Sequence, residues 1–338
     1  MPVITLTRVG LLMKFSLALL LSISLSTHAV FAQDINSLPE SRAFAYRRQL
    51  TSGRVVVELT RETNGKTKDQ LIEGFFDGDQ YHSRFEMELD VTDSSGKTFR
   101  SRDLHKYVFT PTETLYYFDI KQSNGRTVAA YAHRFGDENK NYKEEIFKSS
   151  TGTYCFDPRE IGIVPGGLAT LKTFDIKQIL VPEDFSTCTR SQIEVNGRKL
   201  ERVEHSIANK RLKAVLLIDT DRGPSVVYSS LRSPGPRREE VIDTVESELL
   251  AYGAERLWFP SISVHTRTVD GKVVEKTTYK VTQADFNSKV DHKLFTLAGL
   301  DLPEGHSVIE MTSERNRKVS YWVNGKLVSD VPISSREN

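Results

Sequence analysis

The sequence predicts a β-dominated α+β protein: a curved antiparallel half-barrel sheet with a few helices on its concave face. Three observations predict this fold. Asn-Gly and Asp-Gly pairs, which are typical of tight hairpin turns, recur along the chain. The segments beside them alternate apolar and polar residues with the period of two that half-buried strands show. The apolar fraction of 38% suits a sheet that buries one face and exposes the other face to solvent.

The N-terminal segment has the order of a secretory signal peptide. Arg8 and Lys14 form a basic flank, the apolar run 15–25 follows, and small residues precede a cleavage site after Ala32. The apolar run is shorter than the roughly 20 residues that a membrane-spanning helix needs. We therefore expect residues 1–32 to be removed during export.

The mature chain is expected to be a soluble or envelope-associated protein of the periplasm or cell envelope. Translation from Met1 or from Met13 leaves the same product, which begins at Gln33. Loss of Arg8 and Lys14 changes the net charge from +1 to about −1. Nucleic acid is excluded as the main partner because neutralising phosphates needs a surplus of Lys and Arg. The oligomeric state is left open.

Residues 33–330 are long enough for one large domain or two modest ones. An internal boundary would fall at 183–192, or at 233–236, where Ser-Pro-Gly-Pro forms a stiff joint. No repeat of fixed period is found. The tail 331–338 is expected to fray.

The predicted strands lie on both sides of the hairpin turns. The first group comprises 54–61, 71–76, 81–89, 115–120 and 128–133, with turns at Asn64-Gly65, Asp77-Gly78 and Asn124-Gly125. The second group comprises 193–195, 200–206, 214–219, 225–231, 258–267, 273–281 and 318–323, with turns at Asn196-Gly197, 221–224, Asp270-Gly271 and Asn324-Gly325. The pattern favours consecutive antiparallel hairpins.

Two segments are predicted as helices. Pro39–Leu50 has a broad apolar stripe, and Leu168–Leu180 has a mixed apolar pattern that Pro182 ends. The segment Arg237–Leu250 is ambiguous, since its apolar spacing suits a helix and its branched residues tolerate a strand.

The two cysteines, Cys155 and Cys188, both lie in the expected mature chain. In an oxidising compartment they can form a disulfide, which would stabilise the fold by roughly 4 kcal/mol. The alternative is two buried free thiols. A structural zinc site requires four protein ligands, and two cysteines supply only two of them. No His-rich cluster lies nearby in the sequence. We therefore predict no metal ligand.

The sequence contains no recognisable catalytic motif. The chain lacks Gly-x-Ser-x-Gly, His-Glu-x-x-His and a phosphate-binding loop, since Gly162–Gly167 has no Lys. Cys155 with His133 as its base is a weaker interpretation than a disulfide. We predict no catalytic residue and no cofactor.

Apolar and aromatic strand residues remain as candidates for binding. They either form an ordinary core beneath the predicted helices or line an open hollow that accepts an acyl chain or apolar peptide. The residues are Val55, Val57, Leu59, Phe75, Phe85, Met87, Leu89, Tyr107, Phe109, Tyr116, Phe118, Tyr131 and Phe135.

The layout resembles the lipoprotein-carrier superfamily of exported bacterial proteins, which includes outer-membrane lipoprotein-sorting carriers and periplasmic stress-sensor regulators. The matching parts are the helix at Pro39–Leu50, the hairpins of 53–133 and the helical insert near Leu168. Short motifs resemble a group of uncharacterised exported proteins more closely: Asp157-Pro158-Arg159-Glu160-Ile161-Gly162, Val195-Asn196-Gly197, Leu257-Trp258-Phe259-Pro260, Phe295-Thr296-Leu297 and Leu302-Pro303-x-Gly305-x-x-Val308.

The resemblance implies a strongly curved sheet whose hollow face is plugged by helices. It supplies no catalytic residue, and the carriers are about a third shorter than this chain. Within the first motif, Asp157 and Arg159 are expected to form a structural pair at the entry to a helix.

The preferred function is that of a non-enzymatic envelope protein that binds a hydrophobic ligand, such as a lipid or lipoprotein acyl chain, on the concave face. Burial of each acyl CH₂ group would contribute about 0.8 kcal/mol. One alternative is an envelope sensor or protein-interaction scaffold whose sheet has no ligand cavity. The other is an unrecognised hydrolase.

Overall fold

The computed structural model describes residues 38–92, 95–122, 125–134, 157–163, 188–207, 212–234, 239–311 and 317–329. The first strands are β1 (Ser52–Thr63), β2 (Lys66–Asp77), β3 (Gln80–Thr92), β4 (Thr98–Phe109), β5 (Glu113–Gln122) and β6 (Gly125–Arg134). The next are β7 (Cys188–Val195), β8 (Arg198–Ile207), β9 (Leu212–Asp219), β10 (Ser225–Pro234), β11 (Glu240–Tyr252), β12 (Leu257–Val269) and β13 (Lys272–Phe286). The last are β14 (Ser307–Met311), β15 (Arg317–Val323) and β16 (Lys326–Val328).

Within the described residues, the helical elements are few and short. They are α2 (Pro39–Arg48) and the 3₁₀ turns η3 (Pro158–Glu160), η6 (His292–Phe295) and η7 (Leu297–Leu300). The predicted helix at Pro39 is confirmed, and it ends at Arg48. Within the ranges described above, no helix is both long and apolar enough to cross a membrane. The expected signal peptide, the helix at 168–180 and the tail 331–338 lie outside the described residues.

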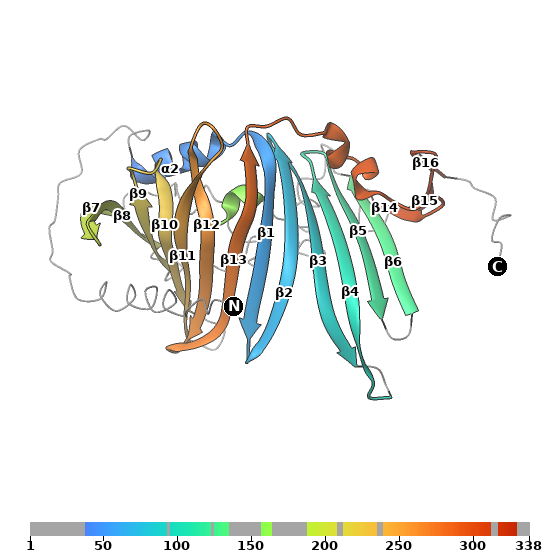
Figure 1. Cartoon of the computed structure of the whole chain (residues 1–338), viewed down its shortest axis with the longest axis horizontal. Coiled ribbons are helices and arrows are strands. Elements are labelled where there is room, and N and C mark those ends of the chain that lie inside the picture. Colours follow the sequence, from blue (N-terminus) through green and yellow to red (C-terminus); the bar gives the residue numbers. More distant parts are fainter. Residues whose placement is uncertain are drawn as a thin grey trace, which may run out of the picture. The chain divides into compact units, whose positions relative to one another are not determined.

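One sheet contains all the described strands, as Figure 1 shows, in the order β16-β15-β14-β6-β5-β4-β3-β2-β1-β13-β12-β11-β10-β9-β8-β7. Two antiparallel meanders, β1–β6 and β7–β13, are joined where β1 pairs with β13. The C-terminal β14 then pairs with β6 in parallel. The predicted curved, β-dominated antiparallel fold is confirmed, and the ambiguous segment near 240 is strand β11.

The turn residues explain the hairpins. Asn64, Asn196, Asp270 and Asn324 all have positive φ, and a positive-φ glycine follows each of them. This is the backbone that a two-residue type I′ turn requires, and it needs small or Asx residues at both positions. At Asp77-Gly78 the prediction is shifted by one residue. Asp77 pairs with Gln80, so Gly78 and Asp79 form the turn.

The two faces of the sheet have different cores. We call the face that packs against α2 and η3 the inner face, and the opposite one the outer face. The inner core comprises Leu50, Val55, Val57, Leu59, Ile72, Phe76, Phe85, Tyr107, Tyr116, Ile161, Phe259, Tyr279 and Val281, with a satellite beneath α2 at Ala43, Ile163, Val203, Leu216, Ile218 and Val226. The outer core lies between β4–β6 and η6–η7 and comprises Val108, Leu115, Tyr117, Ala130, Ala132, Val290, Phe295, Leu300, Leu302 and Val308.

Charged side chains hold α2 and η3 on the inner face. Asp157 accepts a hydrogen bond from the backbone N–H of Arg159 (3.0 Å) and pairs with its guanidinium (2.7 Å), so the predicted structural pair at a helix entry is confirmed. Arg47 of α2 donates to the carbonyl of Arg159 (3.2 Å), and its guanidinium lies 4.6 Å from the ring centre of Phe259. Burial lowers the pKa of Arg47 to about 10. These contacts fix the helix against η3 and β12.

A buried lysine anchors η7 on the outer face. Lys106 is 5% exposed, and its Nζ donates to the Leu300 carbonyl (2.8 Å) and to the carboxylate of Asp301 (2.7 Å). His82 lies on the same face and is also buried, with its ring 5.8 Å from that of Phe75. Burial, with a further contribution from Lys106, lowers the pKa of His82 to about 4.

Gly162, two residues after η3, lies where the chain comes very close to the sheet. Its φ is +80°, and a Cβ there would lie 2.6 Å from Ser247 Oγ and 2.7 Å from Pro260 Cγ. Gly253 has a similar φ of +68° but open space around it. Both Gly→Ala variants suffer the backbone strain of about 1–2 kcal/mol. Gly162→Ala should lose about 1–3 kcal/mol more because it overpacks the docking contact.

Urea unfolding of the two variants measures this difference directly. Equal losses at Gly162 and Gly253 would mean that η3 does not depend on the close approach.

The buried His82 should make stability depend on pH. Its folded pKa of about 4 lies below the ordinary value of 6.5, so the unfolded chain takes up the proton first as pH falls. The free energy of unfolding should therefore fall between pH 6.5 and 4, by about 2 kcal/mol at pH 5 from this residue. Urea titrations across this range should show a shallower pH dependence for His82→Phe. Parallel profiles for the two proteins would contradict the assignment.

Candidate functional site

The inner face of β3–β6 carries a continuous array of aromatic side chains, which we call the aromatic row. Strand register places them on one face, since Tyr107 pairs with Tyr116 and Tyr116 with Tyr131 across the strands. The row comprises Phe85, Tyr107, Tyr116, Phe118 and Tyr131. Tyr107 and Tyr116 stack at 4.4 Å between ring centres, and Phe85 meets Tyr107 edge-on at 5.9 Å.

The row is buried at one end and more accessible at the other. Phe85 and Tyr107 are each 1% exposed and Tyr116 is 8% exposed, whereas Phe118 and Tyr131 are only partly buried. Phe118 lies 5.3 Å from Tyr116 and 6.3 Å from Tyr131 between ring centres. Offset ring pairs at such separations add about 0.5–1.5 kcal/mol beyond their burial. The row is therefore a rigid apolar surface.

Two histidines lie among these rings. His105 shares a 3.1 Å hydrogen bond between its Nδ1 and the Tyr116 hydroxyl, and His133 stacks on Tyr131 at 6.4 Å. Burial lowers the pKa of both histidines, opposed in His105 by the nearby carboxylate of Asp103. Burial therefore favours the uncharged form of both rings.

Most of the lining residues predicted from the sequence lie on the inner face. Buried there are Val55, Val57, Leu59, Phe85, Tyr107 and Tyr116, with Phe109, Phe118 and Tyr131 packed beside them. Met87 is partly buried at an inner-face position opposite Asp103 and Gln70. The Leu89 side chain and Phe135 lie outside the described residues. That these side chains line an open hollow stays a prediction.

The prediction needs correction at Phe75. Consecutive strand residues point to opposite faces, and Phe76 takes the inner position with 0% exposure. Phe75 therefore points outward, where it packs with the outer core and stacks on His82. The double-Phe sequence alone did not determine which ring faces inward.

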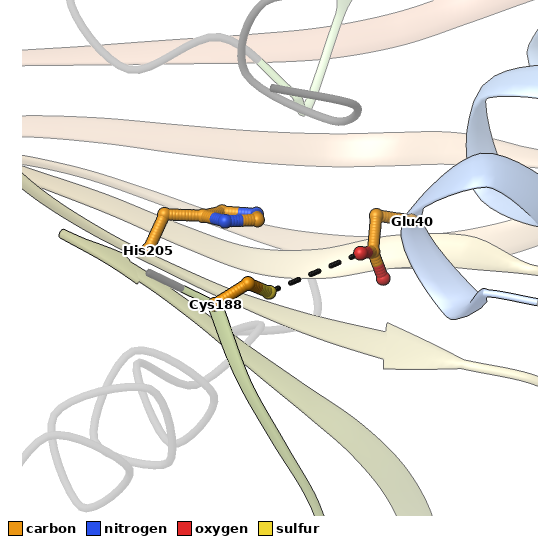
Figure 2. A group of neighbouring side chains, drawn as sticks. All are labelled: Glu40, Cys188 and His205. Carbon is orange, nitrogen blue, oxygen red and sulfur yellow. Dashed lines mark hydrogen bonds between the residues drawn. The ribbon is translucent and has the colours of Figure 1, made fainter. Parts of the chain in front are cut away.

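A polar cluster beneath α2 was not predicted. It comprises Glu40 of α2, Cys188 of β7 and His205 of β8, with Arg190 of β7 paired to the Glu40 carboxylate. Figure 2 shows the cysteine and histidine side chains extending from neighbouring strands toward the glutamate. Cys188 is a free thiol in the structure. Because Cys155 lies outside the described residues, the disulfide stays a prediction.

One signal for this cluster was present in the sequence. Residues at equal distances from a two-residue turn pair across a hairpin, and Cys188 and His205 are equidistant from Asn196-Gly197, which the register confirms. Glu40 lies 148 residues before Cys188, and no local pattern connects it to this hairpin.

No protein-family model matches the sequence, and no curated protein matches it either. Several solved structures are similar. A structure described as an outer membrane lipoprotein-sorting protein domain from Vibrio parahaemolyticus is 9% identical, covers 80% of this chain and 100% of its own, and has a TM-score of 0.44. A DUF1329 family protein from Desulfovibrio piger is 8% identical, with coverages of 77% and 99% and a TM-score of 0.37.

The complex of MucA and MucB from Pseudomonas aeruginosa is also similar, at 11% identity, coverages of 74% and 99% and a TM-score of 0.24. The lipoprotein-sorting structure belongs to the class of protein that the sequence resembles.

Proposed function

We propose that this chain is a non-enzymatic protein of the periplasm or cell envelope that binds a hydrophobic ligand, such as a lipid or lipoprotein acyl chain, against the aromatic row. The observation that carries the proposal is the continuity of the row across β3–β6 on the inner face. The signal-peptide pattern of residues 1–32 supports the location.

The described helical elements and the aromatic row occupy different strands of the inner face. The described helix α2 packs on β8, β9 and β10, and η3 packs on β2. The aromatic row lies on other strands of the same face. The partly buried rings of Phe118 and Tyr131 would contact the ligand, and the buried rings of Tyr107 and Tyr116 would support them.

The chemistry of the row suits an acyl chain. Stacked rings present flat apolar surface, and the two histidines among them have pKa values lowered by burial. Each CH₂ group transferred from water to this surface contributes about 0.8 kcal/mol. A chain of about sixteen such groups therefore supplies roughly 13 kcal/mol, which leaves the roughly 8 kcal/mol of micromolar binding after an association cost of about 4–5 kcal/mol. Binding needs neither a nucleophile nor a proton transfer.

Native mass spectrometry of the mature protein, extracted from its own envelope, tests the proposal. We expect masses of co-purified lipid on the protein. The variant Phe118→Asp should lose the lipid adduct and bind a fluorescent fatty acid at least about tenfold more weakly, because a carboxylate would be desolvated beside Tyr116. Phe118 is chosen because its partial exposure makes the change tolerable for the fold.

The matched control is Leu71→Asp. Leu71 is 44% exposed on β2 and lies on the outer face, because its neighbour Ile72 points to the inner core. This variant should keep the lipid and the fatty-acid affinity. A bare protein mass for both the unaltered chain and Leu71→Asp would favour the interaction-scaffold alternative and count against ligand carriage.

A further inference from the structure

The cluster beneath α2 brings together three different metal-ligating side chains. The ligand atoms of Glu40, Cys188 and His205 all lie within 4.8 Å of one another. The Cys188 thiol points at Glu40 Oε1 over 4.0 Å, as the dashed line in Figure 2 shows. Cys188 and His205 are direct cross-strand partners on β7 and β8, so the backbone fixes their separation.

His205 supplies the second observation. It is 3% exposed, and within the described part of the chain neither of its ring nitrogens has a hydrogen-bond partner. Buried polar atoms in folded proteins nearly always have a partner, because leaving one unpaired costs about 1–3 kcal/mol. Figure 2 shows the imidazole pointing from its strand toward Glu40. The imidazole nitrogens of His205 are therefore available to bind a metal ion beside a thiol and a carboxylate.

We propose that Glu40, Cys188 and His205 bind one Zn²⁺ ion when Cys188 is reduced. Zinc takes thiolate, imidazole and carboxylate ligands at about 2.3, 2.0 and 2.1 Å respectively, in tetrahedral geometry. Ligand atoms in such a site are about 3.4–3.6 Å apart. The present separations need only small side-chain rotations to reach these values. Three protein ligands leave the fourth position to water.

The thiol, imidazole and carboxylate together favour zinc over the hard cations. Thiolate and imidazole select zinc and related transition metals, whereas Mg²⁺ and Ca²⁺ require oxygen ligands throughout. On binding, the Cys188 S–H bond breaks, a Zn–S bond forms and the proton passes to solvent, so no oxidant or reductant is needed.

Arg190 has to be accommodated in this site. Its guanidinium donates to both carboxylate oxygens of Glu40, with Nε at 3.0 Å from Oε1 and 3.2 Å from Oε2. A carboxylate offers about four lone-pair positions, so a metal and an arginine can share it. Partners of this kind orient metal ligands in many sites. The guanidinium charge opposes the dication, and the glutamate and the thiolate together offset it.

The zinc site and the Cys155–Cys188 disulfide exclude each other, because both use the same sulfur atom. The proposal therefore concerns the reduced chain, and the oxidised chain serves as an internal comparison. It is independent of ligand binding at the aromatic row, which lies on β3–β6 rather than on β7 and β8.

Titration of the untagged, reduced mature chain with Co²⁺ tests the site, because cobalt occupies zinc sites and is coloured. We expect one Co²⁺ per chain, a thiolate charge-transfer band and visible ligand-field bands of tetrahedral intensity, all removed by added Zn²⁺. Cys188→Ser should abolish the charge-transfer band, and His205→Asn should weaken Co²⁺ binding at least tenfold. Zn²⁺ should raise the melting temperature of the unaltered chain and not that of Cys188→Ser.

Two matched variants serve as controls. Cys155→Ser removes the other thiol, and His292→Gln removes a histidine whose side chain is 80% exposed. Both should keep the cobalt spectrum. Failure of the reduced chain to bind one equivalent of Co²⁺ would overturn the proposal, as would an unchanged spectrum in Cys188→Ser. If His205→Asn does not fold, as judged by circular dichroism, the cysteine variant and the melting shift still decide the question.

Discussion

The pairing of β1 with β13 is the interaction on which the rest of the structure depends. It joins two meanders that are otherwise separate hairpin series, and it does so over a long sequence distance: the Thr51 N–H donates to Asn287 Oδ1 across 236 residues. At Gly53 the two backbones come so close that a Cβ would lie 2.3 Å from the Asp285 carbonyl oxygen. Only glycine allows that approach.

This junction gives both meanders one common inner face. Because β1 lies between β2 and β13, η3 can contact Gly74 of β2 through Pro158 and also meet β12 through Gly162. Helix α2, which comes just before β1 in the chain, reaches β8–β10 on the same face. The aromatic row and the polar cluster beneath α2 are thus two regions of a single surface.

Electrostatic contacts act together with the apolar packing of Ala43 to hold α2 in place. Glu40 is 0% exposed and Arg47 is 2% exposed, so the helix buries its charges. The first pairs with Arg190 of β7, and the second lies over the Phe259 ring and bonds to η3. Burying charges is costly unless each has a partner. The buried charges therefore specify a single position of α2 on the sheet, and they contribute little to the net free energy of folding.

Sequence patterns predicted the hairpins of this fold, but they predicted little of the pairing between strands that are distant in the chain. Turn chemistry at Asn64, Asn196, Asp270 and Asn324 predicted hairpins correctly, because positive φ at these positions leaves the chain few other conformations. Period-two patterns located most inner-face residues. They could not predict the pairing of β1 with β13 or of β6 with β14, since both depend on contacts distant in sequence. For the same reason Glu40 could not be assigned to its partners on β7 and β8.

The position of β1 has a consequence for how the chain is made. Its neighbour β2 follows after two residues, but β13 is synthesised only some two hundred residues later. Until then one edge of β1 has no strand beside it, and Val55, Val57 and Leu59 belong to an incomplete apolar surface. Such edges recruit other chains. Late closure of the sheet also slows folding because a long loop must be brought together first. The interval between these two strands is the period when the growing chain most needs protection from aggregation.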